Sequence, residues 1–216
     1  MRIAVLGATG KTGTQLVTQA LARGHEVVAL GRDPARLQHG SLSSSSSPSL
    51  TRVRVDVYRP DELRAALAGV DALVSGLGNV GGQPAGVLTT GARAVVDAGV
   101  PRLVWLGAVG TGATRSVGGP LLAILLPLVL RADLDDKVAA ETRLRAAGAS
   151  IVHAGPLGDG GARGGGVLLA PAALPRALWP RTIARADVAA LMLDEAEHPR
   201  FGGGTGVAFV PKQRSV

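Results

Sequence analysis

The sequence predicts an α/β fold, a doubly wound parallel sheet with helices on both faces, formed by one domain over residues 1–216. Short and almost continuously apolar runs recur along the chain, as expected for strands that are covered on both faces. Helical patterns separate these runs, and a repeated strand, helix, strand order favours right-handed crossovers into one parallel sheet. A length of 216 residues is enough for one substantial core.

The expected strands are short and mostly uncharged. They fall at residues 2–6, 27–30, 51–55, 72–75, 102–106, 150–154 and 206–210. Helices are expected between them, at residues 12–23, 60–68, 86–98, 134–147 and 186–196. The first helix has Leu16, Val17, Ala20 and Leu21 along one stripe and stops before Gly24, because glycine is the usual residue just past a helix end.

Two segments depart from this alternation. Residues 41–49 are serine-rich, which is typical of a surface loop of low complexity. Residues 155–182 are rich in glycine and proline and are expected to form an irregular lid on the substrate side. Such a lid would lie over the carboxyl ends of the strands, where ligands bind in open α/β sheets.

Composition limits the classes of partner. The net charge of +7 would suggest nucleic acid, but 20 of the 23 basic residues are dispersed arginines and only 2% of residues are aromatic, so no nucleic-acid surface is expected. The chain has no cysteine and no metal-ligand spacing, so we expect no disulfide and no metal site.

The longest apolar stretch, residues 120–130, is broken by Pro127 and is too short to span a membrane. We expect it to be a hydrophobic helical cap and a possible surface for a protein partner. No signal peptide is expected at the amino end, which indicates a cytoplasmic protein.

A glycine-rich turn follows the first expected strand. Residues 7–13 read GATGKTG, and the helix begins within them. Amides in the first helical turn have no intrahelical acceptor, so a diphosphate can dock there if no side chain blocks it. We expect Gly7 to allow the turn, Gly10 the approach of the diphosphate, and Gly13 the packing of helix on strand. The motif also supplies the polar side chains of Thr9, Lys11 and Thr12.

Two other interpretations of this turn are less favoured. A Walker phosphate loop would need glycine five residues before Gly10, where Val5 stands. A tight turn that needs glycine only for backbone reasons is the second. The flanking strand and helix favour a dinucleotide site and a Rossmann-type fold.

The end of the second strand indicates which dinucleotide is bound. An acidic residue at this place accepts the ribose hydroxyls of NAD, whereas arginine suits the 2′-phosphate of NADP. Arg32 therefore predicts NADP (NADPH), and Arg36 lies one turn further on. Asp33 could instead be the N-cap of a short helix that begins at Pro34. Arg32 could be a surface residue with no role in ligand binding.

Ordered motifs over most of the chain resemble the atypical short-chain dehydrogenases of the NAD(P)-binding, NmrA-like type, in particular the biliverdin reductase B (flavin reductase) group. The motifs are GATGKTG, ALGRDPARL, VDV at 55–57, VSGLG at 74–78, LVWLGA at 103–108, KxxxE at 137–141 and IARADVA at 183–189. The resemblance implies that Asp56 and Val57 lie against the adenine. It also implies that Gly76, Leu77 and Gly78 line the ribose and diphosphate.

The larger dehydrogenase family handles the substrate proton with a serine after the fifth strand and a tyrosine four residues before a lysine. In this chain Gly107 and Ala108 occupy the place of the serine, and Asp133 occupies the place of the tyrosine. Lys137 corresponds to the lysine. Lys137 could hold the nicotinamide ribose. It could equally belong to a solvated ladder of ion pairs at i,i+4 spacing, formed by residues 133, 137, 141 and 145.

His153, in the sixth strand, is the one histidine placed to donate a proton to a substrate. A buried core or second-layer histidine is the more common alternative for such a residue. The run Ala154-Gly155-Pro156 after it lacks the bulkier or charged residue that the reductase group carries.

Two functions remain open. The first is an NADPH-dependent reductase that passes hydride to a small planar acceptor, flavin-like or quinone-like, by positioning and without a catalytic tyrosine. The second is a non-catalytic NADP-binding redox sensor, with residues 120–130 as an interaction surface.

Overall fold

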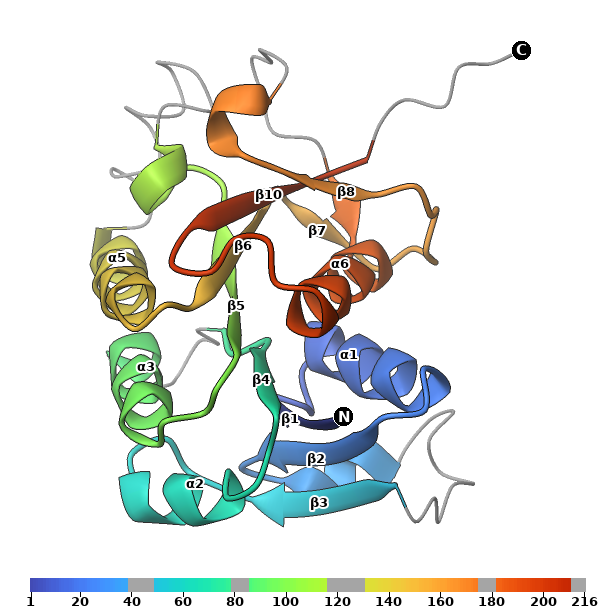
Figure 1. The fold of residues 1–216 in the computed structure, drawn as a ribbon, viewed down its shortest axis with the longest axis vertical. Coiled ribbons are helices and arrows are strands. Elements are labelled where there is room, and N and C mark those ends of the chain that lie inside the picture. Colours follow the sequence, from blue (N-terminus) through green and yellow to red (C-terminus); the bar gives the residue numbers. More distant parts are fainter. Residues whose placement is uncertain (39–48, 79–85, 116–130, 175–181, 211–216) are drawn as a thin grey trace.

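The computed structural model describes residues 1–38, 49–78, 86–115, 131–174 and 182–210 (Figure 1). The apolar stretch 120–130 and residues 41–48 of the serine-rich loop lie outside these ranges. The strands are β1 (Arg2–Leu6), β2 (Glu26–Gly31), β3 (Leu50–Arg54), β4 (Ala72–Ser75), β5 (Leu103–Ala108), β6 (Ser150–Ala154), β7 (Leu157–Gly158), β8 (Val167–Leu169), β9 (Ile183–Ala184) and β10 (Thr205–Phe209). The α-helices are α1 (Lys11–Ala22), α2 (Pro60–Ala66), α3 (Val87–Asp97), α5 (Arg131–Ala146) and α6 (Arg185–Glu197).

Eight of these strands form one sheet in the order β3-β2-β1-β4-β5-β6-β10-β8. Every neighbouring pair is parallel except β10 and β8, which are antiparallel. The chain builds outward from β1 in one direction through β2 and β3, then returns to add β4 on the other side of β1. This reversal opens a crevice beyond the carboxyl ends of β1 and β4, where such folds bind ligands. The expected Rossmann-type fold is confirmed.

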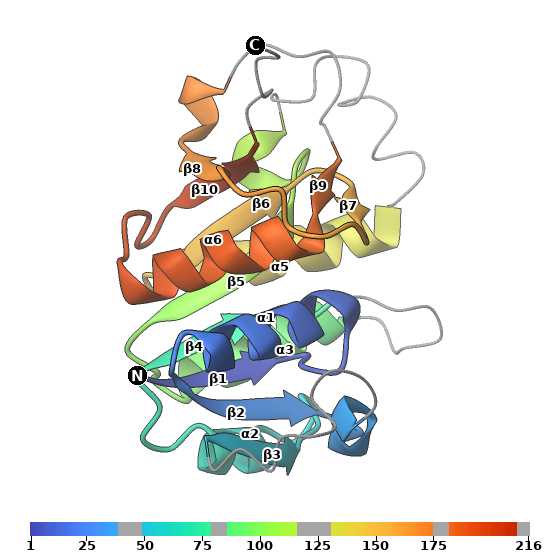
Figure 2. The ribbon, with the colours of Figure 1, turned by 90° about the vertical axis from the view of Figure 1, so that its right-hand side faces the viewer.

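Helices cover both faces of the sheet (Figures 1 and 2). Helices α1 and α6 pack on one face, and α2, α3 and α5 on the other. Alternate residues of β1 serve the two faces: Ile3 and Val5 pack under α1 and α6, while Ala4 and Leu6 face the other layer. All four are at most 2% exposed, as the apolar run predicted for a strand covered on both sides.

The predicted strands and helices are found within a few residues of the expected bounds, with one correction. Residues 155–182, expected to be irregular, contain β7, β8 and a short 3-10 helix at Pro171–Ala173, and β8 adds an antiparallel edge to the main sheet. The strand was missed because its three residues stand between glycines and a proline. Residues 175–181 lie outside the described part of the chain.

Buried carboxylates fix the segments around the crevice. Asp136 of α5 accepts hydrogen bonds from the amides of Leu88 and Thr89 at 3.0 and 2.8 Å, so it caps the start of α3 across the helix interface. Asp187 of α6 accepts the amides of Arg163 and Gly164 and ties down the loop before β8. Both carboxylates are buried and therefore need these donors.

Within the described ranges no helix has the length and apolar character needed to cross a membrane. The same ranges hold no group of three or more metal-ligating side chains.

Candidate functional site

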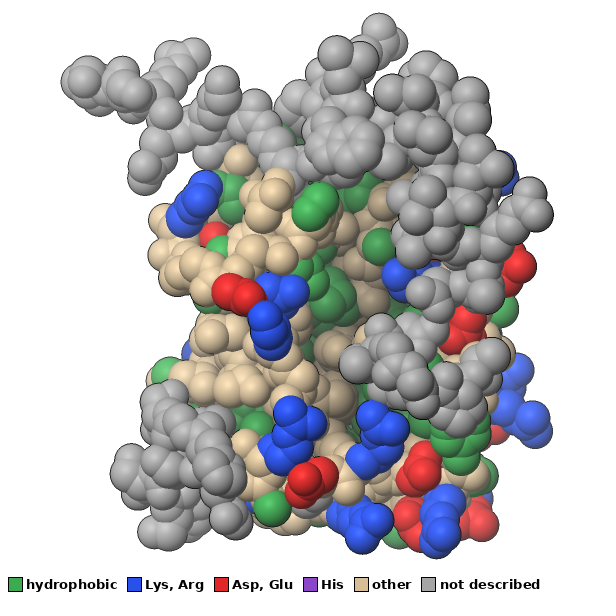
Figure 3. Space-filling view, turned by 180° about the vertical axis from the view of Figure 1, so that it is seen from behind, with side chains coloured by type: hydrophobic (Ala, Val, Ile, Leu, Met, Phe, Trp, Pro, Cys, Tyr) green, Lys and Arg blue, Asp and Glu red, His purple; other side chains and the backbone are tan. Residues whose placement is uncertain are grey.

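A cavity of about 970 Å³ opens at the carboxyl ends of the parallel strands. In Figure 2 these ends lie at the right of β1 and β2, and Figure 3 looks onto that edge of the molecule. Lys and Arg side chains gather on the rim of the hollow and hydrophobic side chains lie in its floor (Figure 3). Volume and position together fit a dinucleotide plus a small second molecule.

The glycine-rich turn forms one wall of the cavity because its backbone leaves no room for side chains. Gly7 has φ +75°, a conformation that favours glycine, and its amide donates to the carbonyl oxygen of Leu30 at 3.1 Å. A Cβ built on Gly13 would lie 2.1 Å from the carbonyl oxygen of Gly7 and 2.8 Å from the Cα of Ala8. Gly13 is therefore required for α1 to pack on the turn. It is buried behind the cavity wall.

The start of α1 presents unpaired amides to the cavity. Gly10 is the N-cap residue and makes no side-chain cap bond. The amides of Lys11, Thr12 and Gly13 find no acceptor among the described residues. Such amides carry the positive end of the helix dipole, so this end of α1 is suited to an anionic diphosphate.

A basic rim lies at the end of β2. Arg32 and Arg36 are both exposed and both line the cavity. Asp33 is exposed and does not line the cavity, and the short 3-10 helix Pro34–Gln38 begins directly after it. The two arginines therefore reach the cavity, whereas Asp33 precedes the 3-10 helix.

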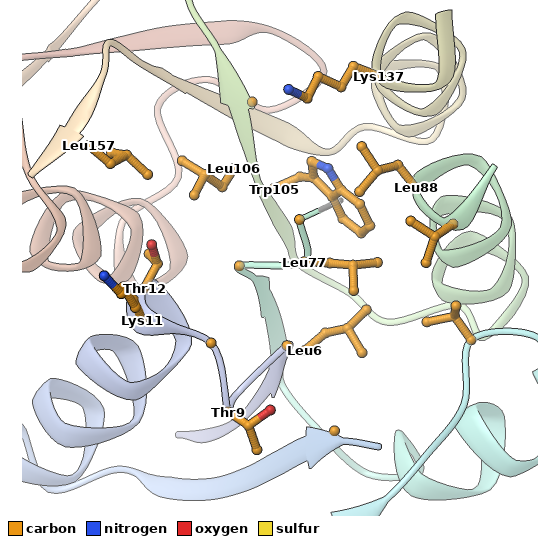
Figure 4. A pocket seen from close by; sticks show the side chains of 18 of the residues that line it. Leu6, Thr9, Lys11, Thr12, Leu77, Leu88, Trp105, Leu106, Lys137 and Leu157 are labelled. Carbon is orange, nitrogen blue, oxygen red and sulfur yellow. The ribbon is translucent and has the colours of Figure 1, made fainter. Parts of the chain in front are cut away.

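The neighbouring wall is apolar. Asp56 turns the chain after β3, because its Oδ1 accepts the amide of Tyr58 at 3.0 Å. Val57, Leu77 and Trp105 then form a continuous apolar surface, which Figure 4 shows around Leu77 and Trp105. A flat base fits between such a wall and the turn. The remaining predicted wall residues, Gly76 and Gly78, also line the cavity.

Three charged side chains bridge the cavity mouth. Lys11 Nζ lies 2.6 Å from Oδ2 of Asp159, and the guanidinium of Arg185 pairs with the other oxygen of the same carboxylate. The hydrogen bond from Lys11, with the charge of Arg185, lowers the pKa of Asp159 below its usual value. Asp159 therefore stays ionised at neutral pH, and acidification through its lowered pKa would weaken the bridge.

The side chain of Lys137 leaves α5 and points toward β5, on the wall of the cavity (Figure 4). The predicted ladder of solvated ion pairs is wrong at Glu141, which is only 2% exposed. Strand β6 and the 3-10 turn after β5 cover that face of the helix. Among the described residues no carboxylate forms an ion pair with Lys137, and the side chain of Asp133 lies outside them.

A buried polar network stands behind Gly107. His153 is fully buried and does not line the cavity, whereas Glu141 does. His153 Nε2 lies 3.1 Å from Oε1 of Glu141, and Nδ1 lies 2.7 Å from the hydroxyl of Thr114. A Cβ on Gly107 would lie 2.4 Å from the imidazole and 2.8 Å from the carboxylate. The imidazole and carboxylate thus fill the space that a side chain at position 107 would need.

A serine at position 107 should therefore destabilise the fold. We expect Gly107→Ser to lower the free energy of unfolding by about 1–3 kcal/mol, because overpacking forces the buried pair to move. Ala108→Ser is the matched control, since Ala108 is partly exposed on the cavity wall, and it should change stability by less than about 0.5 kcal/mol. Urea denaturation measures both. Equal stability of the two variants would contradict this packing.

Sequence reasoning missed several wall residues. Arg185 and Leu157 come from segments far from the glycine motif. Arg185 lies within the IARADVA motif, to which no role in the site was given, and no local pattern marks Leu157. Glu141 was read as a surface residue because its spacing from Lys137 fits an ion pair. The one available signal was Gly107, since a glycine at the end of a buried strand indicates the close approach of another group.

Comparisons with known proteins agree with this geometry. The model of the NAD(P)H-binding family matches residues 7–199. Among solved structures, ChuY, an anaerobilin reductase from Escherichia coli O157:H7, is similar over all of both chains with a TM-score of 0.75 and 21% identity. A candidate NADH-flavin reductase from Streptococcus pneumoniae is similar over 98% of this chain and 100% of its own, with a TM-score of 0.73 and 20% identity.

A curated 3-beta-hydroxysteroid dehydrogenase from Mycolicibacterium neoaurum is 36% identical over 72 residues. That match spans 33% of this chain and only 18% of the relative, so it concerns a local segment. The family match, by contrast, extends from the glycine-rich turn past the end of α6 and includes every lining residue of the cavity except Leu6. The chain belongs to the NAD(P)H-binding family.

Proposed function

We propose that the protein is an NADPH-dependent reductase that transfers hydride to a small planar acceptor, flavin-like or quinone-like, without a catalytic tyrosine. One observation carries the proposal. A single cavity joins the arginine rim and the unpaired amides of α1 to an apolar end beside Lys137. The one tyrosine of its described wall, Tyr58, follows Asp56 and Val57 after β3 and does not stand beside Lys137, and no serine lines that wall. Such a site can bind and orient two flat molecules but has no hydroxyl of the usual kind for proton transfer.

Different residues along the cavity would bind different parts of the cofactor. The amides of Lys11 and Thr12, both lining the cavity, would hold the diphosphate. Arg32 and Arg36 would bind the 2′-phosphate, which selects NADPH over NADH. Asp56, Val57, Gly76, Leu77 and Gly78 would enclose the adenosine, and Lys137 would bond the ribose beside the nicotinamide. When bound, the nicotinamide supplies the hydride.

The acceptor would lie in the apolar end. Leu106 lies on the opposite side of β5 from Trp105, close to Leu157 (Figure 4), and both leucines line the cavity. Flat apolar walls favour a conjugated ring and hold it against the nicotinamide, so positioning would supply most of the catalysis. The names of the two similar structures, an anaerobilin reductase and a candidate flavin reductase, are consistent with such an acceptor. A place within the biliverdin reductase B group is part of this proposal.

The proposal is tested with purified protein, NADPH, and a panel of FMN, riboflavin and a naphthoquinone. Loss of nicotinamide absorbance at 340 nm is followed, and calorimetry gives the affinity for NADPH and NADH. We expect turnover with at least one acceptor and tighter binding of NADPH. Tight binding without turnover of any acceptor would favour the non-catalytic redox sensor instead.

The charged bridge at the mouth gives a further prediction. The Asp159 carboxylate forms ion pairs with Lys11 and Arg185, two cations beside the proposed diphosphate site. We expect Asp159→Asn to raise the affinity for NADPH about two- to fivefold, because both cations become available to the phosphates. Asp61→Asn, an exposed position of α2 outside the cavity wall, is the control and should leave the affinity unchanged. Weaker binding by Asp159→Asn would contradict the prediction.

A further inference from the structure

A buried carboxylate lies next to Lys137 in the cavity wall, where the family's tyrosine is missing. Glu141 follows Lys137 by one turn of α5 and lines the same wall of the cavity. Its carboxylate is buried and reaches into the space left by Gly107 and Gly112: a Cβ on either glycine would lie 2.8 or 2.7 Å from one of its oxygens. Two glycines thus admit a carboxylate to the wall where the family's serine would stand.

The hydrogen atoms around His153 determine what this carboxylate can do. Thr114 has one hydroxyl hydrogen and three acceptors in reach, the carbonyl oxygen of Thr111 at 3.0 Å, Nδ1 of His153 at 2.7 Å and, further away, the carbonyl oxygen of Ala108 at 3.5 Å. Its oxygen also accepts the amide of Gly110. If the hydroxyl bonds the carbonyl three residues back, as threonine in a turn commonly does, Nδ1 must itself carry a hydrogen.

The same shortage of hydrogens recurs at Glu141. The hydroxyl of Thr111 has one hydrogen for two acceptors, the carbonyl oxygen of Ala108 at 2.8 Å and Oε1 of Glu141 at 2.9 Å. Nε2 of His153 lies 3.1 Å from that same Oε1, buried and without an aligned hydrogen-bond partner. An ionised carboxylate facing a bare Nε2 would place two lone pairs together inside the protein, which is costly.

One additional proton removes this conflict. A proton on Nε2 converts this contact into an ion pair between an imidazolium and a carboxylate, with Nε2 and Oε1 3.1 Å apart. Because the two groups lie in contact, the proton belongs to the pair and not to either residue alone. Both side chains are buried, but Glu141 lines the cavity and His153 does not, so a proton of the pair reaches the cavity through the Glu141 carboxylate.

We propose that the Glu141–His153 pair stores a proton and delivers it to the acceptor during reduction. The inference rests on the proposed reductase function. The acceptor gains a hydride, two electrons and one proton, from the nicotinamide, and its new anionic heteroatom takes the stored proton from the Glu141 carboxyl group. The pair regains a proton from water after product leaves. Glu141 is thus the catalytic acid, and His153 is a positioning residue that holds the proton through it.

Two cations of α5 lie within one turn of Glu141. On α5, Lys137 lies one turn before Glu141 and Arg145 one turn after it, and the Arg145 guanidinium lies 3.9 Å from where a Cβ on Gly112 would stand. Strand β6 contributes His153, and among the described residues the turn after β5 contributes the hydroxyls of Thr111 and Thr114.

The test compares Glu141→Gln with the wild type on two acceptors. A naphthoquinone needs a proton after hydride transfer, whereas the N-methylphenazinium cation becomes neutral on taking hydride and needs none. Gln keeps the volume of Glu and the bond to Thr111 but cannot release a proton. We expect kcat with the quinone to fall about 100-fold or more, while the phenazinium rate, corrected for the uncatalysed reaction, and the Kd for NADPH change less than about threefold.

A second readout does not depend on turnover. Long-range ¹H–¹⁵N spectra of the wild type, assigned with His153→Asn, should show protons on both ring nitrogens of His153 at neutral pH. Glu141→Gln should instead show the neutral ring with hydrogen on Nδ1 alone. A neutral ring in the wild type would overturn the proposal, as would equal losses of Glu141→Gln on both acceptors or no loss on the quinone. A wild type that shows the imidazolium but reduces no acceptor would remove the reductase function itself, together with the delivery step.

Discussion

Among the described glycines, Gly13→Ala is expected to cause the largest loss of stability. The new Cβ would stand 2.1 Å from the carbonyl oxygen of Gly7 and 2.8 Å from the Cα of Ala8, and both obstacles are backbone atoms that cannot rotate away. Helix α1 would have to move off β1, where Leu16 and Val17 are now fully buried. We expect a loss of about 3 kcal/mol or more, which lowers the melting temperature by roughly 10 °C.

Differential scanning calorimetry with and without NADPH measures this effect. Gly160→Ala is the matched control, because its Cβ would meet no atom within 4 Å and its φ is not in the left-handed region. The control should melt within about 2 °C of the wild type. We expect NADPH to raise the melting temperature of the control but not of Gly13→Ala, since the amides at the start of α1 move with the helix. Unchanged stability of Gly13→Ala would mean that helix and turn do not pack as described.

Local sequence was sufficient for most of the fold. The central strands are apolar runs bounded by glycine or charged residues, and β1 and β6 were predicted at the bounds they have. Helix ends marked by glycine, such as Gly24 and Gly148, were equally clear, because positive φ is an intrinsic preference of that residue. β8 was missed because its pairing with β10 is a contact between distant segments, and three residues carry no periodic pattern.

The site divides in the same way. The glycine turn and Arg32 were predictable, since the turn and the strand end that position them are local features. The role of Glu141 was not, because a residue at i,i+4 from a lysine is equally typical of a surface ion pair. Only the placement of His153 and Gly107 against it, both from other strands, shows that this carboxylate is buried in the cavity wall.

Arg32→Glu is expected to have the largest effect on ligand choice. Arg32 is exposed at the end of β2 and lines the cavity beside the unpaired amides of α1, so its charge is available to a phosphate on the adenosine ribose. Glutamate would repel that phosphate, while it can accept the hydroxyls of an unphosphorylated ribose. We expect the affinity for NADPH to fall about 100-fold and that for NADH to change less than about threefold, as measured by calorimetry.

The control must separate a local contact from the field of the whole protein. Arg93→Glu makes the same change in net charge on the exposed side of α3, at a residue that does not line the cavity. Its effect on NADPH should be less than twofold at physiological salt, because exposed charges beyond about one Debye length, roughly 8 Å, are screened. Equal losses for NADPH and NADH in Arg32→Glu would instead show that Arg32 acts on the shared diphosphate or on the fold. The preference for NADPH would then have to come from Arg36, and Arg36→Glu would be the variant that reverses it.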